Sequence, residues 1–389
     1  MNWGDAMNKK AIIAMSGGVD SSVAAYLMKK QGYDCMGVTM KLFHNEDIGI
    51  PQTRSCCSLD DVEDARNVAY ELGIPYYVLN FSERFEEDVI ERFVAAYENG
   101  MTPNPCIDCN RYLKFDELYR RARELGYDYV VTGHYAHIEK DVSSGRYLLK
   151  KALDSDKDQS YVLYALTQEQ LAHTQFPLGD MTKHEVCRIA ESQRFINAHK
   201  HDSQDICFVR NGSYADFIEG HTGNKYPEGN FIDCRGNILG RHHGIIRYTI
   251  GQRKGLNIDH EKGPWFVVGK DVVKNILYVC RTDQRDLLYS DSCIVKGINW
   301  ILPSLDEIPT KCTCKFRYRQ KDQNIEIERL DDTSVLVKYP QTIASVTEGQ
   351  EAVFYDGDKC IGGGVIEEVF KDGKNLNQLI METANGYRG

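Results

Sequence analysis

Hydrophobic and polar positions near the start of the chain predict a buried strand, a tight turn and a helix in direct succession. Residues 11–15 are all apolar, as in a strand covered on both faces. Residues 16–22 follow with two glycines and three serines. Apolar residues then recur at helical spacing, at Val23, Ala24, Leu27 and Met28.

Strands and helices alternate over the next hundred residues. The patterns predict strands at 34–40, 75–81 and 127–137 and helices at 61–72, 85–99 and 115–125. Such alternation is typical of a doubly wound α/β domain, a parallel sheet with helices on both faces. Ligands of these sheets bind at the carboxyl ends of the strands. We therefore expect the 16–22 turn, Met40 and the turn at 132–134 to share one rim.

The pattern changes in the second half of the chain. Two helices are expected at 167–174 and 183–192, with no strand between them. From about residue 226, β-rich runs alternate with turn residues, at 265–268, 276–279, 313–319, 334–337 and 352–355, which predicts a small β-barrel. A linking module is expected at 227–274, and the polar tail from Asn375 is expected to be poorly ordered.

Length and composition limit the class of protein. A chain of 389 residues is expected to form two or three domains, and we assign 1–215 to a catalytic domain, 216–285 to a central module and 286–389 to the barrel. With no bilayer-length apolar run and no signal peptide, the expected location is the cytoplasm, without a membrane partner. The 13 cysteines would be reduced there. The net charge of −10 disfavours nucleic acid, unless one face is locally basic.

The 16–22 turn has the features of a phosphate-binding loop. Its glycines let backbone N–H groups close on an anion, Ser16, Ser21 and Ser22 add hydroxyls, and the helix N-terminus adds a positive dipole end. The P-loop and dinucleotide glycine patterns are absent. Ser-Gly-Gly-Val-Asp-Ser instead resembles the pyrophosphate loop of ATP pyrophosphatases, which adenylate a substrate and release pyrophosphate. An ordinary glycine turn is the plainer alternative.

Three cysteine-containing segments are candidates for thiol or metal chemistry. Cys106 and Cys109 form a Cys-x-x-Cys pair before a helix, which lowers a thiol pKa or supplies half of a metal site; two inert loop cysteines are the alternative. Cys207, in an expected apolar strand, resembles a core residue. Cys56 and Cys57 could complete a four-cysteine zinc site, although the paired spacing of a zinc ribbon is missing.

Two basic runs favour RNA binding by the second half of the chain. Residues 241–254 contain no acidic residue, and residues 315–321 interleave basic and aromatic residues. Arg pairs with phosphate through two parallel N–H groups, and Tyr stacks on bases. A solvated strand face is the alternative for each run taken alone.

Together these motifs resemble the tRNA-specific 2-thiouridylase family, part of the PP-loop ATP pyrophosphatases. The matching pieces fall in order between about residues 10 and 369: 16–21, 56–58, 104–105 with 109–110, 132–135, 157–160, 202–203 with 206–208, 248–253 and 317–319. The resemblance implies an α/β PP-loop domain of the adenine nucleotide alpha hydrolase type, followed by a central module and a C-terminal β-barrel.

The resemblance also implies a mechanism in which ATP activates a uridine. The C2 carbonyl oxygen of a tRNA wobble uridine is adenylated, and sulfur then displaces AMP. Asp20 helps to hold Mg²⁺. The residues implied in ATP binding are Ala14, Met15, Ser16, Gly17, Gly18, Val19, Asp20, Ser21, Met40 and Gly133.

Two cysteines carry the sulfur in this family. The resemblance implies that Cys207 receives a persulfide from a sulfur-relay protein or cysteine desulfurase, and that Cys109 resolves it to leave a Cys109–Cys207 disulfide. The residues implied in base or RNA contact are Asn104, Pro105, Cys106, His134, Lys157, Asp158, Gln159, Arg317, Tyr318 and Gln350.

Cys106 departs from the family pattern, which usually has Asp at this position. The target nucleotide is therefore open, and Cys106, Cys109 and Cys207 could instead hold three irons of a [4Fe-4S] cluster whose fourth iron carries hydrosulfide. Two rival functions remain. Another adenylating PP-loop ligase would need neither Cys109 nor Cys207, and a non-catalytic RNA-binding module would not turn over ATP.

Overall fold

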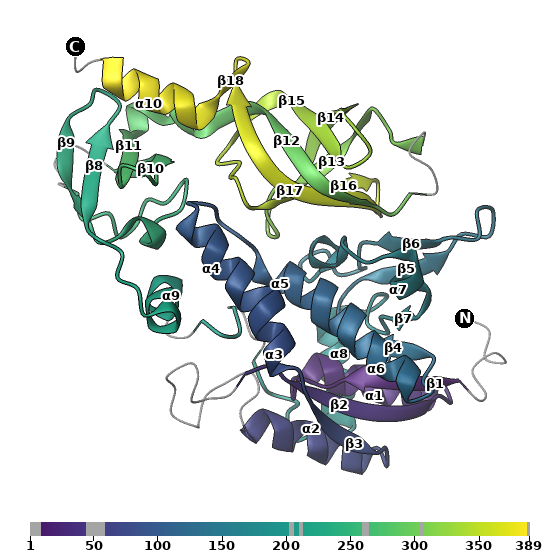
Figure 1. The fold of residues 1–389 in the computed structure, drawn as a ribbon. Coiled ribbons are helices and arrows are strands. Elements are labelled where there is room, and N and C mark those ends of the chain that lie inside the picture. The colour runs from purple at the N-terminus through teal and green to yellow at the C-terminus, as the bar shows by residue number, and fades with distance from the viewer. Residues whose placement is uncertain are drawn as a thin grey trace.

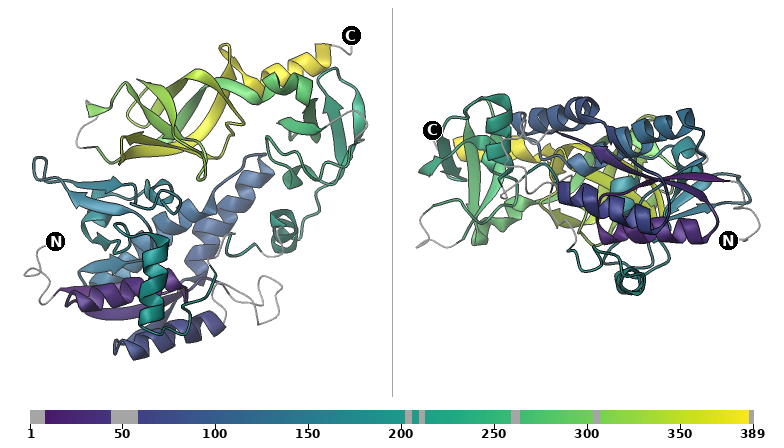
Figure 2. Two further views of the ribbon diagram at one scale, coloured as in Figure 1. Left: turned by 180° about the vertical axis from the view of Figure 1, so that it is seen from behind. Right: turned by 90° about the horizontal axis from the view of Figure 1, so that it is seen from below.

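The computed structural model describes residues 9–43, 59–201, 206–209, 213–258, 264–302 and 307–386. Figure 1 shows three parts: a domain built around a parallel sheet, a β-barrel stacked on it, and a smaller sheet at one side. The views from behind and below show the same arrangement (Figure 2). No helix in the described ranges is both long and apolar enough to span a membrane.

The N-terminal domain is built around the predicted parallel sheet. Its order is β3-β2-β1-β4-β7, every pairing is parallel, and the strands are β1 Lys10–Ala14, β2 Asp34–Lys41, β3 Tyr76–Asn80, β4 Tyr129–Val131 and β7 Thr174–Gln175. The expectation of no strand near β7 is wrong, because two residues are too short to show an alternating pattern.

Helices cover both faces of this sheet, which confirms the doubly wound architecture. Along β1, Ile12 packs into one core, whereas Ala11 and Ile13 pack into the other. The Ala11 face is covered by α1 Val19–Lys30, α2 Leu59–Glu71 and α8 Lys183–Ser192. The Ile12 face is covered by α3 Ser82–Phe85, the π-helix η1 Glu86–Ile90, α4 Glu91–Glu98, the π-helix η2 Cys109–Glu117 and α6 Leu118–Glu124.

The strand expected over 127–137 is in fact divided. β4 ends at Val131, a turn follows, and β5 His137–Lys140 and β6 Tyr147–Lys150 form a hairpin. The chain turns at Gly133 because it packs there on the backbone of α1: a Cβ at Gly133 would lie 2.7 Å from the backbone N of Ser21. β6 then pairs with strand β17 of the barrel, so the hairpin links the two domains.

The rest of the first domain consists of short helices, and the central module is a second sheet. The short helices are α5 Pro105–Asp108, η3 Ser160–Leu163 and α7 Gln168–Ala172. The module has the strand order β10-β11-β8-β9. Its elements are α9 Tyr214–Thr222, β8 Gly229–Asp233, β9 Ile238–His242, η4 Ile245–Arg247, β10 Trp265–Asp271, β11 Ile276–Arg281 and η6 Thr282–Leu288.

The C-terminal domain is the predicted β-barrel, closed by pairing of its first strand with β17. Its strands are β12 Tyr289–Trp300, β13 Lys311–Lys315, β14 Gln323–Arg329, β15 Ser334–Ala344, β16 Glu351–Asp356 and β17 Lys359–Lys371, with β18 Lys374–Asn375 at its edge. β13 ends four residues earlier than predicted, where the chain turns toward the first domain. The tail is helical, contrary to expectation: α10 Leu376–Gly386 buries Leu376, Ile380 and Ala384.

Candidate active site

The turn between β1 and α1 is a backbone cradle of the expected kind. Gly17 has a φ of +78°, and a Cβ there would lie 2.3 Å from the backbone oxygen of Asp61. Gly18 is the N-cap of α1, so the first backbone N–H groups of that helix have no partner within it. The Ser21 hydroxyl donates to the Gly18 carbonyl over 3.0 Å. The backbone is thereby pre-shaped to accept a phosphate.

Residues far away in the sequence hold this loop in place. The Asn197 side-chain amide donates to the Gly17 carbonyl and to the Ser22 hydroxyl, each over 2.9 Å. One carboxylate oxygen of Asp20 accepts from Lys183 at 2.6 Å and from the Tyr135 hydroxyl at 2.9 Å. Sequence reasoning gave no role to Asn197 or Lys183, because no local pattern connects residues more than 150 positions apart with the loop.

The loop opens on a cavity of about 1250 Å³ at the boundary between the first domain and the barrel. Most residues predicted to bind ATP or RNA lie on its walls: Ser16, Gly18, Val19, Asp20, Asn104, Cys106, His134, Lys157, Asp158, Gln159, Arg317, Tyr318 and Gln350. The remaining predicted residues do not line the cavity: Ala14, Met15, Gly17, Ser21, Met40, Pro105, Cys109, Gly133 and Cys207. The structure thus brings together motifs that are over 300 residues apart in the chain.

The Cys-x-x-Cys pair divides into one accessible and one buried thiol. Asn104 is the N-cap of α5, where its side-chain oxygen accepts from the Cys106 N–H over 3.3 Å. Cys106 is exposed to the cavity and Cys109 is buried. Cys207 is partly buried and lies in a turn, not in the expected strand.

The expected depression of a thiol pKa is wrong for Cys106. Although the Cys106 thiol is accessible from the cavity, the surrounding protein desolvates it and raises its pKa to about 11, and the neighbouring Cys207 adds to the rise. The α5 helix is only four residues long, and desolvation outweighs its dipole. The mutual influence of the two thiols shows that Cys207 lies near Cys106.

A buried carboxyl lies behind the Cys106 thiol. Burial raises the pKa of Glu351 well above its usual range, and Asp108 adds to the rise. One carboxyl oxygen of Glu351 has no hydrogen-bond partner among the described residues. Burial also raises the pKa of Asp108 to about 6, opposed by Arg92 and Arg111. The ionised form of Glu351 is therefore disfavoured in the fold, and no sequence pattern predicted this.

His134 is a neutral member of the cavity wall. Burial lowers its pKa well below the usual value, and the cation of Lys114 lowers it further. Its Nδ1 lies 2.7 Å from the Thr132 hydroxyl. Phe115 and Phe176 pack against the ring, so the imidazole is held in one orientation.

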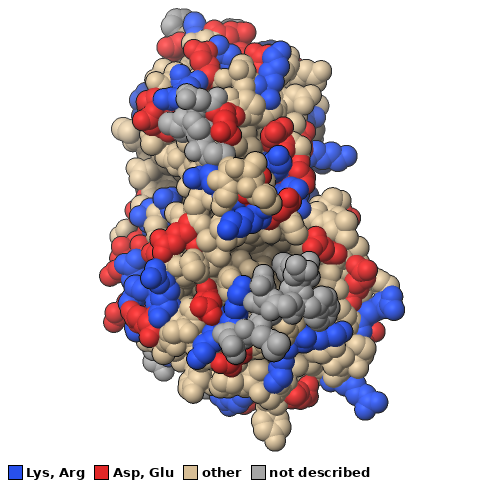
Figure 3. All heavy atoms as spheres, turned by 90° about the vertical axis from the view of Figure 1, so that its right-hand side faces the viewer, with Lys and Arg blue, Asp and Glu red and all other residues tan. Residues whose placement is uncertain are grey.

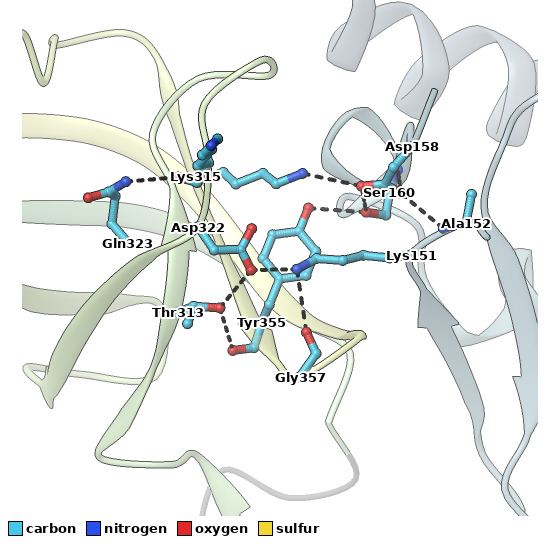
Figure 4. A network of polar contacts seen from close by, with 11 residues as sticks. Lys151, Ala152, Asp158, Ser160, Thr313, Lys315, Asp322, Gln323, Tyr355 and Gly357 are labelled. Atoms are coloured by element: carbon cyan, nitrogen blue, oxygen red, sulfur yellow. Dashed lines mark hydrogen bonds and ion pairs between the residues drawn. The ribbon is translucent and has the colours of Figure 1, made fainter. Parts of the chain in front are cut away.

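A set of polar contacts fixes the barrel against the first domain (Figure 4). The Asp158 carboxylate is 3% exposed and pairs with Lys315 at 3.3 Å. It also accepts from the Ala152 N–H at 3.1 Å and from the Ser160 hydroxyl at 3.0 Å. Ser160 in turn contacts the Tyr355 hydroxyl over 3.2 Å. Asp158 therefore shapes the wall through a carboxylate that is already occupied, and its neighbours Lys157 and Gln159 line the same wall.

Much of the basic charge predicted to bind RNA is paired within the protein. Arg317 donates to the Ile250 and Ser345 carbonyls and to the Thr347 hydroxyl, so it joins the central module to the barrel. In the 241–254 run, Arg241 pairs with Glu228, and Arg247 pairs with two acidic side chains of α9. Acidic and basic side chains are interspersed on the face in Figure 3. Positive charge is therefore a local property of the cavity, where Arg319 and Lys321 also lie.

The residues needed for a metal site are only partly described. Within the described ranges, no three His, Cys, Asp or Glu side chains are arranged to hold a metal ion. Cys106, Cys109 and Cys207 thus do not form a ready ligand set. Cys56, Cys57, Asp202 and Ser203, which carry other parts of the predicted motifs, lie outside the described residues.

Three family matches cover the chain from residue 9 to residue 366. Residues 9–211 match the tRNA methyl transferase HUP domain, residues 215–281 the tRNA methyl transferase PRC-barrel domain, and residues 290–366 the aminomethyltransferase beta-barrel domain. The first match includes the phosphate-binding loop and both cysteine segments of the site.

Curated relatives carry a more specific name. The chain is 49% identical over 362 residues to the tRNA-specific 2-thiouridylase MnmA of Clostridioides difficile, a match that covers 93% of this chain and 99% of the relative. The protein of the same name from Geotalea uraniireducens is 48% identical over 362 residues, covering 92% of this chain and 95% of the relative. The similarity therefore extends over all three parts of the fold.

Proposed function

Because the chain belongs to the tRNA-specific 2-thiouridylase family, we propose that it catalyses ATP-dependent 2-thiolation of a uridine in tRNA. The observation that carries this proposal is the shared cavity. A phosphate-binding loop forms one wall, and a segment with an accessible thiol and polar base-binding side chains forms the other. A cavity of this size accommodates a nucleotide together with an inserted base.

The first step activates the uridine. ATP binds with its phosphates on the 16–21 loop, where backbone N–H groups and the α1 dipole stabilise negative charge. The C2 oxygen of the uridine attacks the α-phosphorus, and pyrophosphate leaves with the electron pair of the broken bond. Asp20, held by Lys183 and Tyr135 through one oxygen, is a ligand for the Mg²⁺ that accompanies ATP.

The second step delivers sulfur. The terminal sulfur of a persulfide on Cys207 attacks C2, and AMP leaves with its oxygen. The Cys109 thiolate then attacks the inner sulfur of Cys207, which releases the thiocarbonyl product and forms a Cys109–Cys207 disulfide. A sulfur-relay protein or cysteine desulfurase supplies the persulfide, and a thiol reductant restores both cysteines.

An iron–sulfur cluster is the alternative carrier of the sulfur. A [4Fe-4S] cluster on Cys106, Cys109 and Cys207 needs the three thiols to converge, and the described residues show no such ligand group. We therefore route no step through a cluster. Anaerobic purification with iron and sulfide analysis, alongside Cys106→Ala, tests this choice. Iron and sulfide that disappear in the variant would favour the cluster, and a trapped Cys207 persulfide without iron would favour the two-cysteine route.

Location and domain roles follow from this assignment. We place the enzyme in the cytoplasm, where its tRNA substrate is found. Residues 1–215 are the proposed catalytic domain, residues 216–285 the central module and residues 286–389 the RNA-binding barrel. The wobble uridine is the proposed target, contacted by Asn104, Pro105 and Cys106.

Nucleoside analysis tests the function directly. Unmodified tRNA is incubated with the protein, ATP and a desulfurase with cysteine, then digested for mass spectrometry. We expect a uridine in which sulfur replaces oxygen, formed only with ATP, and absent with Cys207→Ser or Cys109→Ser. A methylated nucleoside, or full activity of both variants, would overturn the proposal. The first would support the methyl transfer named in the family descriptions, and the second a different PP-loop ligase.

A further inference from the structure

Lys114 lies in the cavity at a position that sequence patterns do not mark. It belongs to the π-helix η2, which begins at Cys109. Hydrogen bonds in a π-helix join residues five apart, as the Leu118 N–H does with the Leu113 carbonyl. Lys114, five residues after Cys109, therefore lies about one turn further along the same helix. π-Helical turns are rare and occur mainly at functional sites.

Lys114 lines the cavity that contains both the phosphate-binding loop and the Cys106 thiol. It lines the same cavity as Ser16 and Gly18 of the phosphate loop. Its cation also acts electrostatically on His134 and on the Cys106 thiol. The ammonium group is thus close enough to influence the Cys106 thiol, in the cavity onto which the phosphate-binding loop also opens.

Lys114 differs from three other lysines of the cavity, which are paired with carboxylates. Lys151 pairs with Asp322, Lys315 pairs with Asp158, and Lys200 pairs with two acidic residues of α2. Lys114 has no carboxylate partner within the ranges that the structure describes. Lys114 is half-buried, so its charge is available to pair with an anionic ligand that enters the cavity. Two anions enter this cavity in the proposed reaction, the nucleotide phosphates and the attacking persulfide.

We propose that Lys114 is a catalytic residue, which donates a hydrogen bond to the phosphate of the adenylated uridine and stabilises AMP as sulfur displaces it. This inference rests on the proposed function. As the C–S bond forms, the bond between C2 and the phosphate oxygen breaks, and its electron pair remains on AMP. The ammonium group of Lys114 stabilises this developing negative charge on the phosphate through a hydrogen bond. No proton is transferred. Such a donor acts on the transition state more than on substrate binding.

The test compares three variants under single-turnover conditions. Lys114→Met keeps the length of the side chain and removes its charge, Lys114→Arg keeps the charge, and Lys30→Met removes an exposed lysine at the far end of α1. Each protein is loaded with persulfide and mixed with saturating ATP and tRNA. Three quantities are measured: the burst of pyrophosphate, the rate of 2-thiouridine formation, and tRNA affinity by filter binding.

The expected pattern separates charge stabilisation from binding. Lys114→Met should form 2-thiouridine about 10²–10³-fold more slowly, as when a single oxyanion donor is removed. Its pyrophosphate burst and tRNA affinity should change less than about tenfold, and Lys114→Arg should recover part of the rate. Lys30→Met should match the unsubstituted protein.

Three outcomes would overturn the inference. A normal rate for Lys114→Met would show that the cation is dispensable. An equal loss of the pyrophosphate burst would place Lys114 in adenylation, and a proportional loss of tRNA affinity would make it an RNA anchor. Failure of the unsubstituted protein to make 2-thiouridine would instead count against the proposed function.

Discussion

The two walls of the cavity are built in different ways. The nucleotide wall consists of residues 16–20, one continuous loop whose shape comes from backbone geometry. The thiol wall combines the 104–114 segment with Tyr318 and Gln350 of the barrel. Gln350, for example, donates to the Thr102 carbonyl over 2.6 Å, across the domain boundary. The nucleotide wall is therefore one loop braced from within the first domain, by Asn197 and Lys183, and the thiol wall depends on how two domains are held together.

This difference suggests a division of labour. A backbone loop can bind the phosphates common to every ATP-dependent relative, whereas a wall assembled from two domains can be adjusted to one base and one sulfur chemistry. Damage to either wall should therefore impair different steps. Substitutions in each wall test that separation.

Loss of the Asp158–Lys315 ion pair, which joins the first domain to the barrel, should have the largest effect, and it should fall on the thiol wall. Asp158→Ala leaves Lys315 buried without its carboxylate and removes the acceptor of three further donors, so we expect a loss of about 3–5 kcal/mol in unfolding free energy. Lys315→Met should cost less, about 1–2 kcal/mol, because Asp158 keeps its other donors. Denaturant unfolding measures both. Equal losses of unfolding free energy in Asp158→Ala and Lys315→Met would contradict this prediction. Both variants should still bind ATP.

Gly17→Ala should damage the nucleotide wall. Its Cβ would overlap the backbone of Asp61, and its φ is positive, so we expect a loss of about 2–4 kcal/mol and of ATP turnover. Gly32→Ala is the matched control, since Gly32 has a φ of +88° with open space around it, and its cost should be about 1 kcal/mol. Thermal unfolding and pyrophosphate release give the comparison. Equal stability and equal pyrophosphate release in the two variants would argue against a phosphate-binding role for the loop at Gly17.

Glu351→Gln should change how stability depends on pH. The raised pKa of Glu351 means that the folded protein holds a proton that the unfolded chain releases above a pH of about 4.3. Its contribution to stability is complete below that pH and is lost as pH rises toward the folded-state pKa. The variant should therefore be more stable than the parent at pH 8, by roughly 1–3 kcal/mol. Glu71→Gln, at an exposed site, should leave the pH slope unchanged.

His134→Gln should have the smallest effect, a change in how stability falls as the pH becomes acidic. The lowered pKa of His134 means that the unfolded chain gains a proton below a pH of about 6.5 and the folded protein does not. Its stabilising contribution is present above that pH and is lost as pH falls, by about 1.4 kcal/mol per unit. Unfolding free energy is measured between pH 7.5 and 5.5. It should fall less steeply with decreasing pH in His134→Gln than in His199→Gln, which replaces an exposed histidine.

Sequence patterns predicted the nucleotide wall well and the thiol wall only in part. The apolar run, the glycines and the following helix are continuous in the chain, so the strand, the turn and α1 were predicted together. The π-helical register of Lys114 and the buried carboxyl of Glu351 arise from tertiary packing and leave no local pattern. Asp158 shows the limit of a motif: the match predicted an RNA contact, and the structure adds an ion pair to the barrel.

The Cys207→Ser variant tests whether adenylation of the uridine and delivery of sulfur are separate steps. The variant is mixed with ATP and unmodified tRNA, and pyrophosphate and 2-thiouridine are measured in the same reaction. We predict a pyrophosphate burst close to that of the unsubstituted protein and no 2-thiouridine, because the nucleotide wall is intact and the sulfur carrier is missing. Loss of the burst together with the product, or continued formation of 2-thiouridine, would contradict this account.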